Sequence, residues 1–171
     1  MALNVETGTG SATSESYASV VDATVFHANF GNTAWAALAT DALKEQALRR
    51  ATAYMIQVYR ERWKGFRLLA TTQALDWPRQ SVYLDQLGFK TYVPSNSIPV
   101  EIKNACCEYA LRASAGALIP DVERQTLSES IGSLSVTYAP GAPQNTTFNS
   151  IDMMLRPFLK NGGNGIQIIR A

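Results

Sequence analysis

The longest amphipathic stretch of the chain is residues 41–63, which read DALKEQALRRATAYMIQVYRERW. Apolar residues recur along it every three to four positions, while most charged and amide side chains fall on the opposite side. Thr40 precedes the stretch, and threonine is a residue type that caps helix N-termini. The stretch therefore predicts a long helix that starts at Asp41, ends near Trp63 and lies with one face on a hydrophobic core.

Three further segments carry helix start and stop signals. They run from Ser14 or Ser16 to Gly31, from Pro99 to Gly116, and from Asn149 or Ser150 to Pro157. The middle one is rich in alanine and other small residues, which let neighbouring helices approach closely. We therefore expect it to be the central helix of a bundle.

A β-hairpin is predicted between the last two helices. Residues 125–131 and 134–138 alternate in polarity around Gly132-Ser133, a two-residue turn with glycine first. The turn and the alternation agree on one register, in which Leu127 faces Tyr138, Glu129 faces Val136 and Ile131 faces Leu134.

Outside these elements the chain shows two polar or glycine-rich ends and one long irregular segment. Residues 65–97 have no clear periodicity but several aromatic side chains, which is typical of a functional or partner-ordered segment. The small, polar residues at the start of the chain predict a flexible or partner-ordered arm. At the other end, Ile166, Ile168 and Ile169 predict a strand that pairs with a sheet edge of this chain or of another.

The predicted fold class is mainly α, with a small β component: a small helical bundle with a β-hairpin and extended N- and C-terminal arms. The predicted organisation is a flexible arm over residues 1–15, one helical domain over 16–160, and a glycine-rich hinge with a strand-like tail over 161–171. The domain contains the long loop 65–97 and the hairpin 125–138.

Composition narrows the function classes. Apolar residues make up 46% of the 171 residues and charged residues only 17%, which excludes a solvated, disordered chain. Fifteen basic and fourteen acidic residues leave a net charge of +1, so nucleic acid could be met only through a local basic patch. The sequence has no apolar run long enough to span a membrane and no signal sequence, so we expect synthesis in the cytoplasm and no membrane partner.

No catalytic constellation stands out in the sequence. The single histidine, His27, is expected to be a capping or surface residue, and it makes a histidine-based metal cluster or a Ser-His-Asp arrangement improbable. Cys106 and Cys107 are expected to be small buried residues. We therefore expect a protein that is not an enzyme and needs no metal or cofactor.

The one charge asymmetry lies in residues 41–67, which carry seven basic and three acidic side chains. They include the candidate DNA or inter-subunit contacts Arg49, Arg50, Arg60, Arg62 and Lys64. Such a cluster either pairs with phosphates or forms an ordinary solvated helix face, and the residues alone leave both readings open.

Aromatic and apolar side chains supply a second set of candidates. Trp63, Phe66 and Trp77 would suit base stacking, but such residues are as often part of a core. Trp77 is accordingly either an anchor at a subunit contact or a core residue. The candidate assembly contacts are Trp77, Arg79, Tyr83, Ile166, Ile168 and Ile169.

Several sequence blocks together resemble a known family of small proteins from tailed phages and prophages. The blocks are residues 5–11 (VETGTGS), 14–17 (SESY), 47–54 (ALRRATAY), 62–65 (RWKG), 74–79 (ALDWPR), 98–99 (IP) and 128–132 (SESIG). This family carries the label of DnaT-like single-stranded-DNA-binding proteins, and its members also look like head–tail connector adaptors, or head-completion proteins.

The two labels imply different functions. An adaptor is a structural virion protein at the head–tail interface. Copies of it, usually twelve, form a ring that joins the portal protein to a neck or tail protein and extends the channel for packaged double-stranded DNA. A DnaT-like protein would instead coat single-stranded DNA. The near-neutral charge and the predicted apolar tail favour the adaptor, with single-stranded-DNA binding as the alternative.

Overall fold

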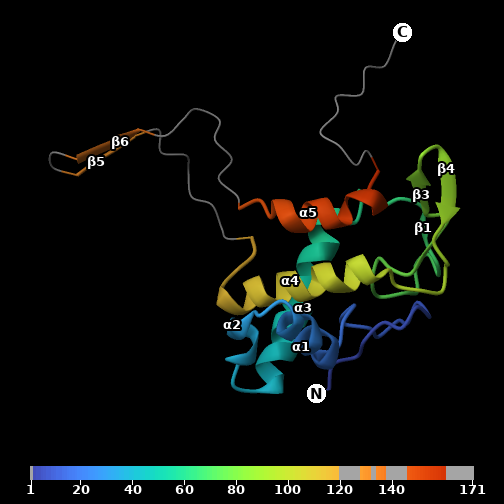
Figure 1. Cartoon of the computed structure of the whole chain (residues 1–171), viewed down its shortest axis with the longest axis horizontal. Helices are drawn as coiled ribbons and strands as arrows, with labels where there is room; N and C mark the ends of the chain where they lie inside the picture. Colours follow the sequence, from blue (N-terminus) through green and yellow to red (C-terminus); the bar gives the residue numbers. More distant parts are fainter. Residues whose placement is uncertain (1, 120–127, 132–133, 138–145, 161–171) are drawn as a thin grey trace, which may run out of the picture.

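The computed structural model describes residues 2–119, 128–131, 134–137 and 146–160 (Figure 1). Its helices are α1 (Val20–Asn29), α2 (Thr33–Ala36), α3 (Asp41–Tyr59), α4 (Val100–Ala115) and α5 (Asn149–Leu155), followed by the 3₁₀ turn η1 (Arg156–Phe158). The strands in the described residues are short and pair two by two. The fold is therefore mainly α with a minor β component, as the sequence predicted.

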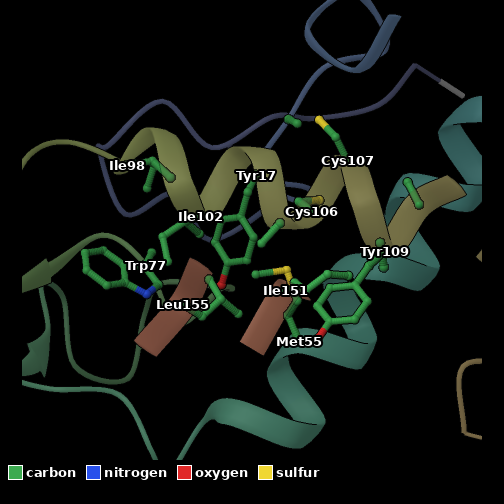
Figure 2. Close-up of a cluster of buried hydrophobic side chains, with 14 of the residues drawn as sticks. Tyr17, Met55, Trp77, Ile98, Ile102, Cys106, Cys107, Tyr109, Ile151 and Leu155 are labelled. Atoms are coloured by element: carbon green, nitrogen blue, oxygen red, sulfur yellow. The ribbon is translucent and has the colours of Figure 1, made fainter. Parts of the chain in front are cut away.

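The pair α3–α4 forms the centre of the molecule, and α1 and α5 also pack on α4. The surfaces that meet are built from small residues on both helices, so the two backbones come close: Ala47 and Ala51 on α3, and Ala105 and Ala110 on α4. Larger side chains fill the space around them, among them Ile102 of α4, Ile151 of α5, and Tyr17 and Trp77 from connecting segments (Figure 2). The prediction of α4 as the central helix is confirmed.

The start of α3 agrees with the sequence and its end does not. The Thr40 hydroxyl accepts a hydrogen bond from the Leu43 N–H at 3.3 Å, as expected of an N-cap. The helix stops at Tyr59 because the following residues leave it and pair with the end of the described chain, through a bridge between Trp63 and Leu159.

The first helix begins later than predicted. Ser19 caps α1 in a reciprocal arrangement with Asp22, so that each side chain accepts from the other residue's backbone N–H. Ser16, one of the predicted caps, lies instead in an extended segment bridged to Val5. The four-residue helix α2 was not predicted.

The N-terminal segment lies against the body of the protein, which differs from the flexible arm predicted over residues 1–15. The backbone N–H of Glu6 donates to the Ser16 carbonyl at 2.9 Å, and that of Glu15 donates to the Asn4 carbonyl at 2.7 Å. Glu6 itself is buried. Its carboxylate supplies acceptors for the polar loop that follows, and this internal pairing replaces the solvent or partner that the composition suggested.

The segment predicted to be irregular, residues 65–97, contains two small antiparallel sheets. Strand β1 (Phe66–Arg67) pairs with β2 (Arg79–Gln80), and β3 (Tyr83–Gln86) pairs with β4 (Phe89–Tyr92). Figure 1 shows the β3–β4 hairpin at one end of the helical body, beside β1.

The hairpin predicted over residues 125–138 is confirmed within the described residues. Strands β5 (Ser128–Ile131) and β6 (Leu134–Thr137) pair with Glu129 opposite Val136 and Ile131 opposite Leu134. The predicted Leu127–Tyr138 pair, the Gly132-Ser133 turn and the tail over residues 161–171 lie outside the described residues.

Three smaller expectations can be compared with the structure. Both cysteines are free and buried as expected, and burial raises the pKa of both thiols, which keeps them protonated. His27, expected to cap a helix or lie at the surface, is buried between α1 and α4, where its Nε2 lies 3.0 Å from the Cys107 carbonyl oxygen. Among the helices of the described residues, none is both long and apolar enough to span a bilayer.

Candidate nucleic-acid interface

The candidate site begins where the chain leaves α3. The backbone N–H of Lys64 donates to the Phe158 carbonyl at 2.9 Å, and that of Lys160 donates to the Arg62 carbonyl at 2.7 Å. Side chains alternate along such a pairing, so the burial of Trp63 and Leu159 turns their basic neighbours outward. Two segments almost one hundred residues apart in sequence thus place Arg62, Lys64 and Lys160 on one side of the protein.

The β3–β4 hairpin adds aromatic rings to these cations. Tyr83 and Tyr92 are directly opposite each other in the register, with ring centroids 6.3 Å apart. Side-chain alternation places Lys90 on the same face of the hairpin. Tyr92 is 64% exposed, so its ring is open to solvent over most of its surface.

Two lysines lie over the Tyr83 ring. The Nζ atom of Lys64 is 5.0 Å from the ring centroid and that of Lys90 is 4.8 Å from it. Lys64 is also held by the carbonyl oxygens of Tyr83 and Pro157, at 3.3 and 2.8 Å. We refer to Lys64, Tyr83, Lys90 and Tyr92 as the Tyr–Lys surface.

This arrangement combines the two kinds of group that hold a single-stranded nucleic acid. Aromatic rings stack on bases whatever their identity, and lysines neutralise the phosphates between them. The electrostatic attraction is modest, because Asp85 stands opposite Lys90 in the register and Glu61 precedes Arg62. Stacking would therefore carry a large share of the binding.

The basic residues proposed from the sequence do not form one patch. Lys64 belongs to the Tyr–Lys surface, and Arg62 lies on the same side of the protein, with its guanidinium over the Tyr59 ring. Arg60 donates to the buried carboxylate of Asp76 at 3.0 Å, so that an acidic partner offsets its charge.

The other two cations serve the body of the protein. Arg49 donates to Glu15 at 3.0 Å, a hydrogen bond that raises the pKa of Arg49 and lowers that of Glu15. Arg50 donates to the Ala113 carbonyl at 3.0 Å, near the C-terminal end of α4. The sequence correctly predicted that both arginines lie on the polar side of α3. It did not show that each of them binds a different partner within the chain.

Trp77 and Arg79 are not surface contacts in this chain. Trp77 is fully buried and belongs to the hydrophobic cluster of Figure 2. Its ring packs edge-on against Trp63 and Phe158. The Arg79 guanidinium is buried and donates to the carbonyl oxygens of Lys64, Gly65 and Asp76, at 2.8, 2.7 and 3.2 Å. Arg79 thus holds the backbone at Lys64 in place, and in this way it supports the Tyr–Lys surface without being exposed on it.

The remaining candidates are partly buried in the core and partly exposed at the surface, and some lie outside the described residues. Trp63 is fully buried and so cannot stack on a base, whereas Phe66 is exposed on β1. Tyr83 belongs to the Tyr–Lys surface. Ile166, Ile168 and Ile169 lie outside the described residues.

Sequence reasoning missed Lys90 and Tyr92, although a signal for them was present. Residues 83–92 read YLDQLGFKTY, two short alternating runs around a Leu-Gly turn. This is a hairpin pattern, and a hairpin pairs the two terminal tyrosines on one face.

The comparisons with known proteins give one result. Over residues 1–171 the chain matches the model of the family described as "Putative DnaT-like ssDNA binding protein". No match was found among curated proteins or among solved structures. Since the match covers the whole chain, the protein belongs to this DnaT-like single-stranded-DNA-binding family.

Proposed function

We propose that the protein binds single-stranded DNA through the Tyr–Lys surface, without catalysing a reaction on it. The observation that carries the proposal is the exposed Tyr92 ring beside Tyr83, together with the Lys64 and Lys90 ammonium groups over the Tyr83 ring. Membership of a family described by this activity supports the proposal independently. The adaptor role favoured by composition has no such support from the family description.

The chemistry also sets the expected strength and salt dependence of binding. Each stacked base is worth about 1–3 kcal/mol, and the arrangement of rings suits only a few bases per chain. Lys64 and Lys90, together with Arg62 and Lys160 on the same side of the protein, could neutralise three or four phosphates. The logarithm of the affinity should then fall against the logarithm of the salt concentration with a slope of about −2 to −3. Binding by one chain is therefore weak, and useful coating requires several copies along the strand.

The test is fluorescence anisotropy of a labelled single-stranded oligonucleotide, titrated with the full chain at several salt concentrations. Tyr92→Ala should weaken binding about tenfold, the value of one lost stack. Lys90→Gln should weaken binding and make the salt slope shallower by about one contact.

Matched controls lie away from the Tyr–Lys surface. Lys44→Gln removes a charge at the opposite end of α3, and Phe30→Ala removes an exposed ring after α1. Both should bind like the unchanged chain. If the four variants weaken binding equally, or if the unchanged chain does not bind at all, the Tyr–Lys surface is not a DNA site.

A second candidate function is the adaptor ring, and one observation favours it. Val21 and Val25 are one helical turn apart on α1 and are 70% and 54% exposed, so this helix shows an apolar stripe on its outer side. Such a stripe suits contact with another copy. Copies in a ring at a phage neck would meet a portal and a neck or tail protein, as the resemblance implies.

Sedimentation velocity distinguishes the two candidates. A ring subunit should form a large species, and Val21→Ser combined with Val25→Ser should dissociate it. If the unchanged chain remains a monomer at high concentration and still binds the oligonucleotide, the adaptor ring is rejected and the DNA-binding proposal stands.

A further inference from the structure

The turn between β3 and β4 presents an apolar side chain directly to solvent. Leu87 is 100% exposed, and Phe89, at the start of β4, is 78% exposed. An exposed leucine alone would mean little, because folded proteins expose much apolar surface. The conformation of its backbone gives it more weight.

Leu87 has a φ of +53°, in the left-handed region. Glycine, asparagine and aspartate adopt this region readily, and other L-residues rarely do. Gly88, with a φ of +85°, is a suitable residue for the next position of the turn. A leucine held here disfavours the turn without burying its side chain, and an outlier of this kind points to a function outside the fold.

The tip is also held firmly in place. The backbone N–H of Gly88 donates to the Asp85 carboxylate at 3.0 Å, and Gln86 pairs with Phe89 to close the turn. The apolar tip is therefore presented in a fixed position at the end of the hairpin.

The charges beside the tip favour nucleic acid as its partner. Lys90 lies next to Phe89 on β4, and its ammonium group faces Tyr83 together with that of Lys64. Phosphates bound by these lysines would bring the bases of the same strand alongside the hairpin. Apolar side chains that meet DNA in this way insert between or against stacked bases.

We propose that the Leu87 tip is a wedge that packs against the terminal base pair of a duplex, where that duplex meets a single strand lying on the Tyr–Lys surface. The preferred ligand is then a junction between single- and double-stranded DNA. This inference rests on the proposed single-strand binding and adds a specificity to it.

The test compares a labelled single strand with the same strand joined to a short duplex. The unchanged full chain should bind the junction about tenfold more tightly, the contribution of one leucine packed on a base pair. Leu87→Asn should bind both ligands equally, with unchanged affinity for the single strand. Since asparagine is favoured in the left-handed region, this variant should melt at the same temperature as the unchanged chain or higher.

Leu43→Gln, which removes an exposed leucine from the first turn of α3, is the matched control and should keep the junction preference. A fluorescent base analogue at the first single-stranded position beside the duplex should brighten on binding the unchanged chain, because the wedge takes its place on the terminal base pair, and should not brighten with Leu87→Asn.

Failure of the inference can be told apart from failure of the function on which it rests. Single-strand binding without junction preference, or a preference that survives Leu87→Asn, overturns the wedge and leaves the proposed function intact. A change of oligomeric state in Leu87→Asn with unaltered junction preference makes the tip a contact between copies, and also overturns the wedge. Absence of any DNA binding overturns both.

Discussion

The carboxylate of Glu6 accepts hydrogen bonds from four consecutive backbone N–H groups. One oxygen accepts from Gly8, Thr9 and Gly10 at 2.8–3.0 Å, and the other accepts from Ser11 at 2.9 Å. Glycine is required at the first of these positions, since its φ is +106° and a Cβ there would lie 2.2 Å from the Asn96 carbonyl oxygen. A single anion thus organises the loop that joins the N-terminal segment to the body.

Glu6→Gln should lower the free energy of unfolding by about 1–3 kcal/mol, because an amide offers one acceptor oxygen and sets its own N–H group against the backbone donors. Chemical denaturation measures the change. Glu61→Gln, at an exposed site, is the control and should change stability by less than about 0.5 kcal/mol. Equal effects of the two variants would contradict the role given to Glu6.

His27 makes stability depend on pH. Burial lowers the pKa of His27 below the ordinary value of about 6.5, because the charged ring is poorly solvated there, and the hydrogen bond to the Cys107 carbonyl oxygen offsets only part of this effect. The unfolded chain therefore binds a proton at a higher pH than the folded chain does. Stability from this residue is fully present above about pH 6.5 and is lost as the pH falls towards the pKa of the folded state.

We expect the free energy of unfolding to decline as the pH is lowered from neutral through 6.5, and His27→Gln to flatten that decline. Denaturant titrations at a series of pH values measure both. The glutamine variant should be less stable than the unchanged chain at neutral pH, where the imidazole fits its two partners. A pH profile with the same slope in both proteins would show that other groups govern it.

At the scale of elements, the start of helix α3 is fixed locally, by the Thr40 side chain, whereas its end is fixed by pairing with a distant segment. Thr40→Ala should cost about 1 kcal/mol, because it removes the acceptor for the Leu43 N–H. Thermal and denaturant unfolding would report the loss. Thr71→Ala, in an exposed turn, is the control and should leave stability almost unchanged.

The same contrast explains which elements could be predicted from the sequence. Helix ends that depend on a neighbouring residue were predicted closely. These are the start of α3 at Thr40 and the two ends of α4 at Pro99 and Gly116. The β5–β6 register follows from local alternation. By contrast, the end of α3 is set by pairing between residues 62–64 and 158–160, which no local pattern can show.

The candidate site shows the same division. Arg62, Lys64 and Tyr83 could be singled out by residue type, but their grouping depends on that long-range pairing and on the missed β3–β4 hairpin. A tryptophan beside a proline gives no sign of whether it faces a core or a partner, and Trp77 turned out to face the core. Charge alone could not show that Arg49, Arg50 and Arg60 have partners within the chain.

At the scale of the whole molecule, Trp77 joins segments that are far apart in sequence. Its ring packs edge-on against Trp63, which follows α3, and against Phe158 in η1. Trp77→Ala should therefore lower the free energy of unfolding by about 3–5 kcal/mol, measured by denaturant titration. Phe66→Ala, an exposed aromatic position on β1, is the control and should cost far less. A Trp77→Ala protein with unchanged stability but lost self-association would instead return Trp77 to a subunit contact.

The pairing of residues 62–64 with residues 158–160 has a consequence for protein synthesis. Lys64 reaches its place only when the Pro157 and Phe158 carbonyl oxygens are available to hold it. A nascent polypeptide that has left the ribosome only as far as α4 carries both tyrosines and both lysines of the surface, yet lacks the segment that holds Lys64. Under the proposed function, the contribution of Lys64 to DNA binding would therefore arise only late in translation, and an incompletely made chain would hold the strand more weakly than a finished copy.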